Sequence, residues 1–84
     1  MTDVRADAAI RLLFFGKVAD ALGRARAFGI PDGGCTVAEL RRLIDAETLG
    51  QKGVRASVNR QIVGEDARVR PGDEVAFFSV FSGG

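Results

Sequence analysis

The chain has 84 residues, of which 46% are apolar, and 12 lysines and arginines against 11 aspartates and glutamates give a net charge of +1. These values fit one small folded domain and argue against a disordered chain or a nucleic-acid binder. The absence of histidine and the single cysteine exclude a histidine-assisted nucleophile, an internal disulfide and a Cys-x-x-Cys site. No apolar run approaches the roughly 20 residues of a membrane span. The first residues do not read as a signal peptide, so we expect a reduced, cytoplasmic protein.

The first part of the chain predicts two strands and a short helix. Residues 1–8 read as a polar, flexible leader. Branched and aromatic residues from Ala9 to Phe15 predict a strand. Lys17 to Leu22 predict a short helix that ends at Gly23, and Arg24 to Ile30 predict a second strand paired with the first.

A capping box marks the start of the main helix. In Thr36-Val37-Ala38-Glu39, the threonine hydroxyl and the glutamate carboxylate can each bond the other residue's backbone amide. The apolar residues that follow recur at spacings of three and four, which predicts one buried stripe: Val37, Leu40, Leu43 and Ile44. Arg41, Arg42 and Asp45 are expected to face away from this stripe, and the helix to end near Glu47.

The second half of the chain predicts three more strands. Alternation predicts a strand from Val54 to Val58, and a tight turn at Asn59-Arg60 leads to a short strand from Gln61 to Val63. Gly64 to Val69 is expected to be an irregular crossing. Arg70-Pro71-Gly72-Asp73 fits a type II turn before the last strand, Glu74 to Val80. We therefore expect one domain over residues 9–81 and a flexible tail over residues 82–84.

The alternation of the strands leaves one sheet face without a helix. The predicted fold is α+β, with a sheet of four to five strands and one main helix across one face. Ile10, Leu12 and Phe14 point to one face of the first strand, and the next residues point to the other. The second face collects a set of apolar residues: Leu13, Phe15, Ala76, Phe78 and Val80. Such a patch usually marks a protein interface, unless a loop or the Lys17 to Leu22 segment covers it.

The sequence ends in Gly83-Gly84. Glycine has no Cβ atom and can pass through a narrow channel, and the carboxylate of a terminal glycine is sterically open to activation by a partner. A frayed end without a function is the alternative interpretation. The tail follows an apolar strand that we expect to be central, which favours a functional tail.

Other reactive groups give weaker signals. Cys35 precedes the main helix, where the helix dipole would favour a thiolate, but a lone cysteine at such a place is more often a packing residue. The acidic pairs Glu65-Asp66 and Asp73-Glu74 lie on turns, so we expect them to be solvated and to bind no metal. The sequence contains no P-loop, and any ATP-dependent step therefore requires a partner.

Four segments carry a family resemblance in their order along the chain. They are Ile10 to Gly16 with Val18 to Gly23, Thr36 to Leu40, Ser57-Val58-Asn59, and Glu74 to Gly84 after the Arg-Pro-Gly-Asp turn. Together they resemble the small subunit of molybdopterin synthase (the MoaD family) over about residues 9–84. One departure is that Ser79 and Val80 stand where the family commonly has two prolines, which would stiffen the start of the tail.

The resemblance implies a ubiquitin-like β-grasp fold and a sulfur-carrier role. Gly84 would be adenylated by a ubiquitin-activating-like adenylyltransferase, converted to a thiocarboxylate and inserted, with Gly83 giving clearance, into the synthase large subunit. There it would donate sulfur to cyclic pyranopterin monophosphate during molybdenum cofactor biosynthesis. The resemblance also places Phe15 and Phe78 against the large subunit, in agreement with the apolar face. With the rest of that face and the tail they give the expected partner-binding residues: Leu13, Phe15, Phe78, Val80, Phe81 and Ser82.

The same resemblance implies how the chain works with others. It would be a co-substrate that is not catalytic alone, in a heterotetramer of two small and two large subunits. It would bind no cofactor, because the activating enzyme consumes the ATP. The balanced charge and the short apolar runs argue separately against binding to nucleic acid or a membrane. A sulfur carrier for thiamine, cysteine or tRNA thiolation, a ubiquitin-like modifier joined to lysines, and a plain interaction module remain alternatives.

Overall fold

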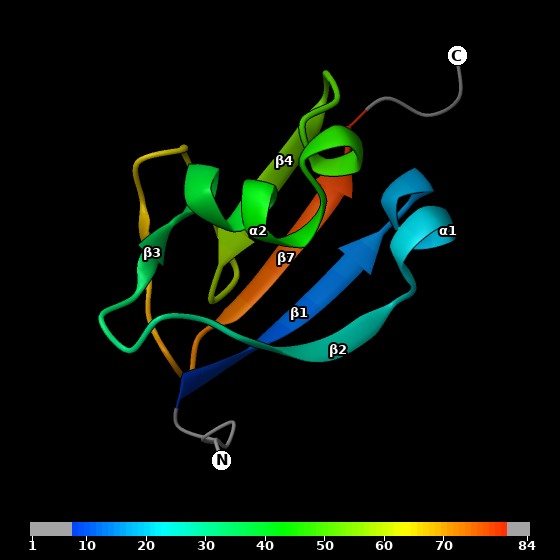
Figure 1. Cartoon of the computed structure of the whole chain (residues 1–84). Coiled ribbons are helices and arrows are strands. Elements are labelled where there is room, and N and C mark those ends of the chain that lie inside the picture. The colour runs from blue at the N-terminus through cyan, green and yellow to red at the C-terminus, as the bar shows by residue number, and fades with distance from the viewer. Residues whose placement is uncertain (1–7, 81–84) are drawn as a thin grey trace.

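The computed structural model describes residues 8–80, which form a five-stranded mixed sheet with helices on one face (Figure 1). The strands are β1 (Ala9–Phe15), β2 (Ala25–Gly29), β4 (Val54–Val58), β5 (Gln61–Val63) and β7 (Glu74–Ser79), in the spatial order β2-β1-β7-β4-β5. The central pair β1–β7 is parallel, and the other neighbours are antiparallel. The predicted mixed sheet is confirmed, as is the central place of the last strand.

Two helices supply the apolar cover of the sheet. The main helix, α2 (Val37–Leu49), crosses one face in front of β4 and β7, and the short α1 (Lys17–Leu22) follows β1 (Figure 1). Val18 of α1 belongs to the same core as the sheet and α2. The largest fully buried side chains are Phe14, Phe77, Leu12, Leu40, Leu49, Val37, Val69 and Val75. Within residues 8–80, no helix is long and apolar enough to cross a membrane.

A second, two-stranded sheet replaces part of the predicted irregular crossing. β3 (Cys35–Thr36) pairs antiparallel with β6 (Arg68–Val69). Two-residue strands are too short to show the alternation by which strands are recognised, so the sequence did not predict them. Gly34 is required at this contact, because a Cβ atom there would lie 2.5 Å from the carbonyl oxygen of Val69. The crossing also serves α2, since Val37 and Ala38 donate their N–H groups to carbonyls of this segment at 3.0 and 3.1 Å.

The predicted stripe of α2 is wrong at two positions. Val37 and Leu40 are buried and Ile44 is partly buried, but Leu43 is 53% exposed. Arg41, expected to face away, has a side chain only 14% exposed. At 3.6 residues per turn, Arg41 lies about 40° around the helix from Val37 and Leu43 about 120°. The core therefore faces the Arg41 side of the stripe, and Leu43 falls outside it.

The helix also extends beyond the predicted end near Glu47 and bends on the way. Asp45 has an extended backbone (φ −169°, ψ 94°) inside α2. Its Oδ1 accepts the N–H of Thr48 at 2.9 Å, which is the bond that an N-cap residue makes. Asp45 therefore starts a separate final turn, which ends at Leu49.

The two predicted tight turns are confirmed. Asn59 and Arg60 have φ of 52° and 74°, the pair of positive values required by a two-residue type I′ hairpin. Gly72 has φ of 93°, and Asp73 N–H donates to the Arg70 carbonyl at 3.0 Å, as a type II turn requires. These turns fix the register of β4 with β5 and the entry into β7.

Candidate functional site

The sheet face opposite α2, here called the open face, carries the predicted apolar patch. Because paired residues point to the same side of a sheet, the strand register places them in rows. The middle row runs Ala25, Leu13, Ala76, Ser57 and Ile62 from β2 to β5, and the next row runs Phe15, Phe78 and Arg55. Apart from Ser57 and Arg55, these residues are apolar, and they form a band across the sheet.

Neither helix covers this band. Phe15 is 53% exposed and Val80 48%, while Leu13 and Phe78 are partly buried beside them. The alternative in which α1 folds over the open face is excluded, because α1 packs its buried residue Val18 into the core on the other face. A band of large apolar groups left open to water is typical of a protein-binding surface.

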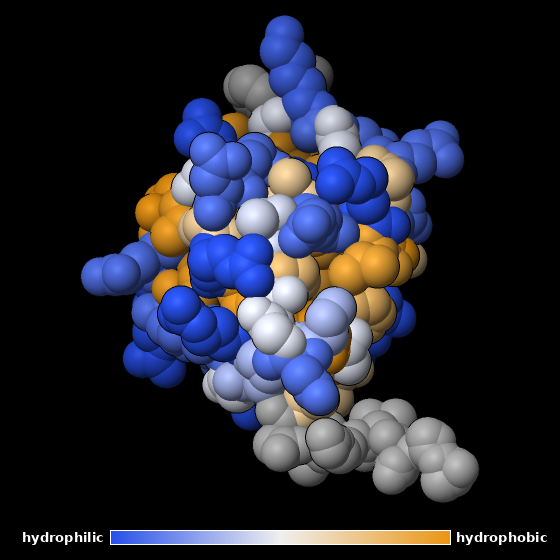
Figure 2. Space-filling view, turned by 60° about the vertical axis from the view of Figure 1, so that its left-hand side comes forward, coloured by the Kyte–Doolittle hydropathy of each residue, from blue (hydrophilic) through white to orange (hydrophobic). Residues whose placement is uncertain are grey.

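Charged side chains border the apolar band near both ends of β7. Glu74 lies 3.9 Å from Arg11 and 3.8 Å from Arg60, and Arg55 lies beside Phe78 in the strand register. Exposed ion pairs of this kind contribute little to stability, so their effect is mainly on which charges a partner meets. Seen from the side of β3, the molecule shows mostly hydrophilic groups, with hydrophobic ones gathered towards both margins of the view (Figure 2).

The chain leaves the sheet at the same end as the aromatic row. β7 ends at Ser79, and Val80 still donates its N–H to the Gly53 carbonyl at 2.8 Å. That bond keeps the backbone in line with β4 up to the last described residue. Gly16, which directly follows Phe15, lies against Ser79, since a Cβ atom on it would be 4.0 Å from the Ser79 Cβ. The end of β7 therefore lies beside Phe15 and Phe78.

The predicted partner-binding residues divide into two groups. Leu13, Phe15, Phe78 and Val80 are brought together on or beside the open face. Phe81, Ser82, Gly83 and Gly84, together with leader residues 1–7, lie outside the described residues. The patch can therefore be described, and the chemistry assigned to the tail stays a prediction.

Ile62 is a part of the patch that the sequence interpretation did not include. It is 68% exposed, the largest value among the large apolar side chains of the described residues. It pairs with Ser57, and so lies on the open face. The sequence could have placed Ile62 on this face, because the two-residue loop at Asn59-Arg60 fixes which residues of β4 and β5 pair.

Cys35 lies in the core, away from the open face. It is buried in β3, and burial is the main cause that raises the pKa of its thiol, with Glu39 adding to the rise and Arg68 opposing it. A neutral buried thiol is a poor nucleophile, which favours the packing role over a sulfur relay. In the described part of the chain, no group of three or more histidine, cysteine, aspartate or glutamate residues could hold a metal ion.

Comparison with known families gives one match that covers most of the chain. The sequence profile of the ThiS family matches residues 12–84. The match includes the open face, the small sheet and the Gly-Gly tail. No curated protein matches the chain in sequence.

Solved structures with the same architecture come from archaea and a eukaryote. SAMP1 from Haloferax volcanii superposes with a TM-score of 0.70 at 21% identity, over 90% of this chain and 99% of that one. A putative molybdopterin converting factor subunit 1 from Pyrococcus furiosus gives 0.72 at 20% identity, over 86% and 97%. Urm1 from Trypanosoma brucei gives 0.69 at 21% identity, over 92% and 96%. At these identities the likeness establishes the fold, which is the predicted ubiquitin-like β-grasp.

Proposed function

The chain belongs to the ThiS family of ubiquitin-like sulfur-carrier proteins, and from this premise we propose that it carries sulfur on the carboxylate of Gly84 for molybdopterin synthesis. The proposal includes two partners. An adenylyltransferase activates the tail, and the large subunit of molybdopterin synthase receives it. The chain itself is a co-substrate, because it contains no P-loop with which to bind ATP. A reduced cytoplasmic setting suits a thiocarboxylate.

The proposed chemistry balances without a redox step on this chain. The Gly84 carboxylate attacks the α-phosphate of ATP, so that an acyl adenylate forms and pyrophosphate leaves. A sulfide-level nucleophile held by the activating system then displaces AMP and leaves a thiocarboxylate. Transfer of that sulfur to cyclic pyranopterin monophosphate, with water supplying the oxygen, restores the carboxylate.

One observation carries the proposal: the last described residues of the chain, Ser79 and Val80, lie beside the open face. The chain leaves β7 beside Phe15 and Phe78, next to a surface that no helix covers. A partner that binds this surface would receive residues 81–84 directly. The border of Arg11, Arg55 and Arg60, with Glu74 among them, favours a partner whose apolar patch is flanked by acidic groups.

The choice of molybdopterin synthase as the recipient of the sulfur is supported by the sequence resemblance and by one structural neighbour. The Pyrococcus furiosus protein with this fold is described as a putative molybdopterin converting factor subunit. The small archaeal modifier protein from Haloferax volcanii superposes equally well, which favours a protein modifier as the second candidate. Conjugation would join the same activated glycine to a lysine, so the two candidates differ in the product formed at Gly84.

The first test is the intact mass after incubation with ATP, a sulfur donor and a matched activating enzyme. Replacing oxygen by sulfur adds about 16 Da, which one oxidation of Cys35 or Met1 would mimic. The C-terminal peptide must therefore be mapped as well. A gain located at Gly84 is expected. Higher-mass lysine conjugates in place of that gain would favour the modifier, and no change with a demonstrably active enzyme would refute both.

Replacement of the terminal residue, Gly84→Ala, is expected to abolish sulfur loading without unfolding the domain. A methyl group would crowd the reacting carboxylate, whereas the residue lies beyond the last strand of the sheet. Loading is measured by mass and folding by thermal unfolding, with the unchanged chain as the reference. Normal loading of the variant, or its unfolding, would contradict the prediction.

Charge placed on the open face is expected to block partner binding. Phe15→Arg introduces a cation into the apolar band, and Leu43→Arg is the matched control, because both side chains are 53% exposed but Leu43 lies on α2. We expect binding to the large subunit to weaken by at least about tenfold for Phe15→Arg and to change little for Leu43→Arg. Calorimetry with the purified large subunit measures both. Equal effects would show that the open face is not the docking surface.

A further inference from the structure

Among residues 8–80, no strand pairs with the backbone groups on the outer edge of β2. β2 is the first strand in the sheet order, so only one of its sides pairs with a strand of residues 8–80. On that side, Phe14 N–H donates to the Arg24 carbonyl, and Ile30 N–H donates to the Ala8 carbonyl, both at 2.9 Å. These two bonds determine which residues of β2 bond to β1 and which do not, because the two kinds alternate along the strand.

This alternation determines which groups of β2 point away from the sheet. In an antiparallel pair, hydrogen-bonded and non-bonded residue pairs alternate. Arg26 and Phe28 therefore use their N–H and C=O groups towards β1, in the same phase as Arg24 and Ile30. The residues between them direct theirs outwards: Ala25, Ala27 and Gly29. All three are exposed, and no proline or positive φ interrupts the strand.

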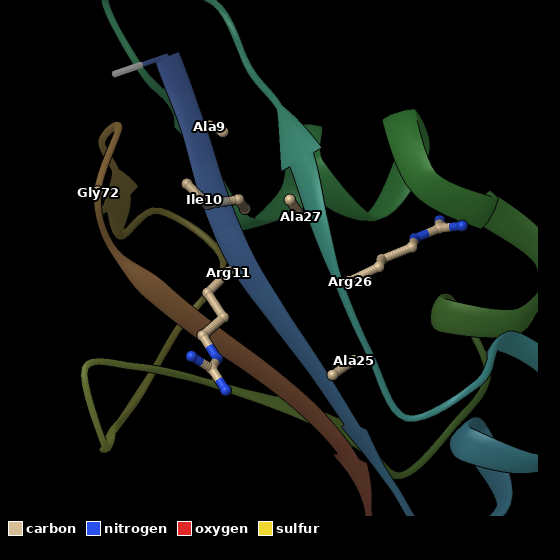
Figure 3. A pocket seen from close by; sticks show the side chains of 7 residues that line it. All are labelled: Ala9, Ile10, Arg11, Ala25, Arg26, Ala27 and Gly72. Carbon is tan, nitrogen blue, oxygen red and sulfur yellow. The ribbon is translucent and has the colours of Figure 1, made fainter. Parts of the chain in front are cut away.

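The small side chains on this edge leave room for another strand. On the open face, Ala25 and Ala27 carry only methyl groups, and with Arg11 and Gly72 they border a shallow groove of about 480 Å³ that lies over β1 and β2 (Figure 3). Arg26 extends in the opposite sense, away from β1 and towards α2 (Figure 3). Its guanidinium lies 5.8 Å from the centroid of the Phe28 ring. A strand added beside β2 would meet the small side chains of Ala25 and Ala27 on the open face and the guanidinium of Arg26 on the other face.

The charges on this edge of β2 favour an acidic strand over a basic one. Within residues 8–80, Arg24 and Arg26 form no ion pair, and Arg11 has only the 3.9 Å contact with Glu74. Asp20 and Arg24 line the same depression, so Arg26 is the arginine of this edge that has no acidic partner among residues 8–80. A second copy of the chain would bring the same arginines to the contact, and like charges across paired strands are destabilising. An acidic strand would be attracted by the same groups.

We propose that the free edge of β2 binds an extended acidic segment of a partner protein by strand addition. The outward groups of Ala25, Ala27 and Gly29 form the backbone ladder, and Arg24 and Arg26 pair with carboxylates of the segment. The arginines also discourage pairing between two copies of the chain, which charged edge residues commonly do. This site is separate from the tail and requires no sulfur chemistry, so it can be tested independently of the proposed function.

The test follows the backbone amides of the full, isotope-labelled chain by NMR. The probe is a synthetic peptide of alternating glutamate and valine, acetylated and amidated at its ends, and a lysine–valine peptide is its control. Saturating glutamate–valine peptide is expected to slow hydrogen exchange at Ala25, Ala27 and Gly29. Arg26 and Phe28 are expected to change little, because their amides already bond to β1. The lysine–valine peptide is expected to leave all five unchanged.

Two pairs of variants separate the backbone and charge contributions. Ala27→Pro removes one outward N–H without removing a bond to β1, and Ala27→Val keeps that N–H. The proline variant is expected to bind the glutamate–valine peptide roughly tenfold more weakly, and the valine variant within about twofold of the unchanged chain. Arg26→Glu is expected to abolish binding, whereas Lys52→Glu, an exposed position in the loop between α2 and β4, should preserve it. Arg26→Glu keeps the proposal testable if Ala27→Pro does not fold.

Three results would overturn the proposal. The first is peptide binding that protects amides of β5 or α2 and leaves the β2 edge unchanged. The second is equal binding of the acidic and the basic peptide. The third is protection of Ala25, Ala27 and Gly29 that rises with protein concentration in the absence of peptide, which would identify a second copy as the occupant.

Discussion

At the scale of single residues, Arg41 joins α2 to the segment before β6. Its Nε and Nη2 donate to the Glu65 carboxylate at 2.8–3.1 Å, and Nη1 donates to the Leu49 carbonyl. Its guanidinium also lies 5.4 Å from the centroid of the Phe77 ring. A planar fork with several donors meets these partners together, which an ammonium group cannot do.

Replacement of this side chain by lysine tests that geometry. Arg41→Lys keeps the charge but loses the bidentate contact, so we expect the free energy of unfolding to fall by about 1–2 kcal/mol. Arg42→Lys, the exposed neighbour, is the control, with an expected change within about 0.5 kcal/mol. Urea denaturation measures both. Equal effects would mean that the Arg41 contacts do not stabilise the fold.

At the scale of the element, the capping box gives α2 a dependence on pH. Thr36 N–H donates to Glu39 Oε1 at 2.8 Å, and Glu39 N–H donates to the Thr36 hydroxyl at 3.1 Å. The hydrogen bond from the Thr36 backbone is the main cause that lowers the pKa of Glu39 below its ordinary range, and Arg68 and Arg42 add to it. A lowered carboxyl pKa stabilises the folded chain above the unfolded pKa, and this contribution is lost as the pH falls through the folded pKa.

Removal of the Glu39 charge is therefore expected to matter more near neutral pH than in acid. The free energy of unfolding of Glu39→Gln should lie below that of the unchanged chain at roughly pH 7, and the difference should shrink towards roughly pH 3. Denaturation at a series of pH values measures it. Glu47→Gln, in the last turn of α2, controls for the loss of a carboxylate alone. A difference that grows in acid would contradict the assigned role.

Helices, strands and turns could be predicted where the residues that indicate them lie close together in the sequence. The capping box at Thr36 and Glu39, the turn at Gly72 and the alternation in β1 and β7 each lie within a few residues, and the structure confirms them. Arg41 and Asp45 could not be placed, because their positions depend on Glu65, on Phe77 and on a bend, all set by tertiary packing. β3 and β6 exist only through each other and carry no pattern of their own.

At the scale of the whole molecule, the adjacent phenylalanines of β7 distinguish the two faces of the sheet. Phe77 is fully buried and stacks with Phe14 at a centroid distance of 6.3 Å, whereas Phe78 lies on the open face. Phe77→Ala is expected to lower the free energy of unfolding by about 3–5 kcal/mol, which is enough to unfold a marginally stable domain. Phe78→Ala is expected to cost far less while weakening partner binding. Thermal unfolding ranks the two, and the reverse order would invert the assignment of the faces.

The candidate site was predictable to the extent that alternation governs it. Leu13, Phe15, Phe78 and Val80 were assigned to one surface from their parity in two strands. The strand register brings the first three together, and Val80 follows directly after β7. Ile62 was missed, since its side of the sheet depends on the pairing across Asn59-Arg60. The identity of the partner lies in a surface that this chain does not contain, so the sequence of one chain constrains it only through charge and shape.

The parallel pairing of β1 with β7 determines how the fold would respond to mechanical force. Five residue pairs, from Arg11–Glu74 to Phe15–Phe78, join β1 and β7, which are the first and last strands along the chain. Because the strands run in the same direction, tension between the start of β1 and the end of β7 loads all their hydrogen bonds together in shear. They would not open one by one, as the strands of a hairpin pulled apart from its ends do. Force applied between these two points would therefore be resisted by all five residue pairs at the same time.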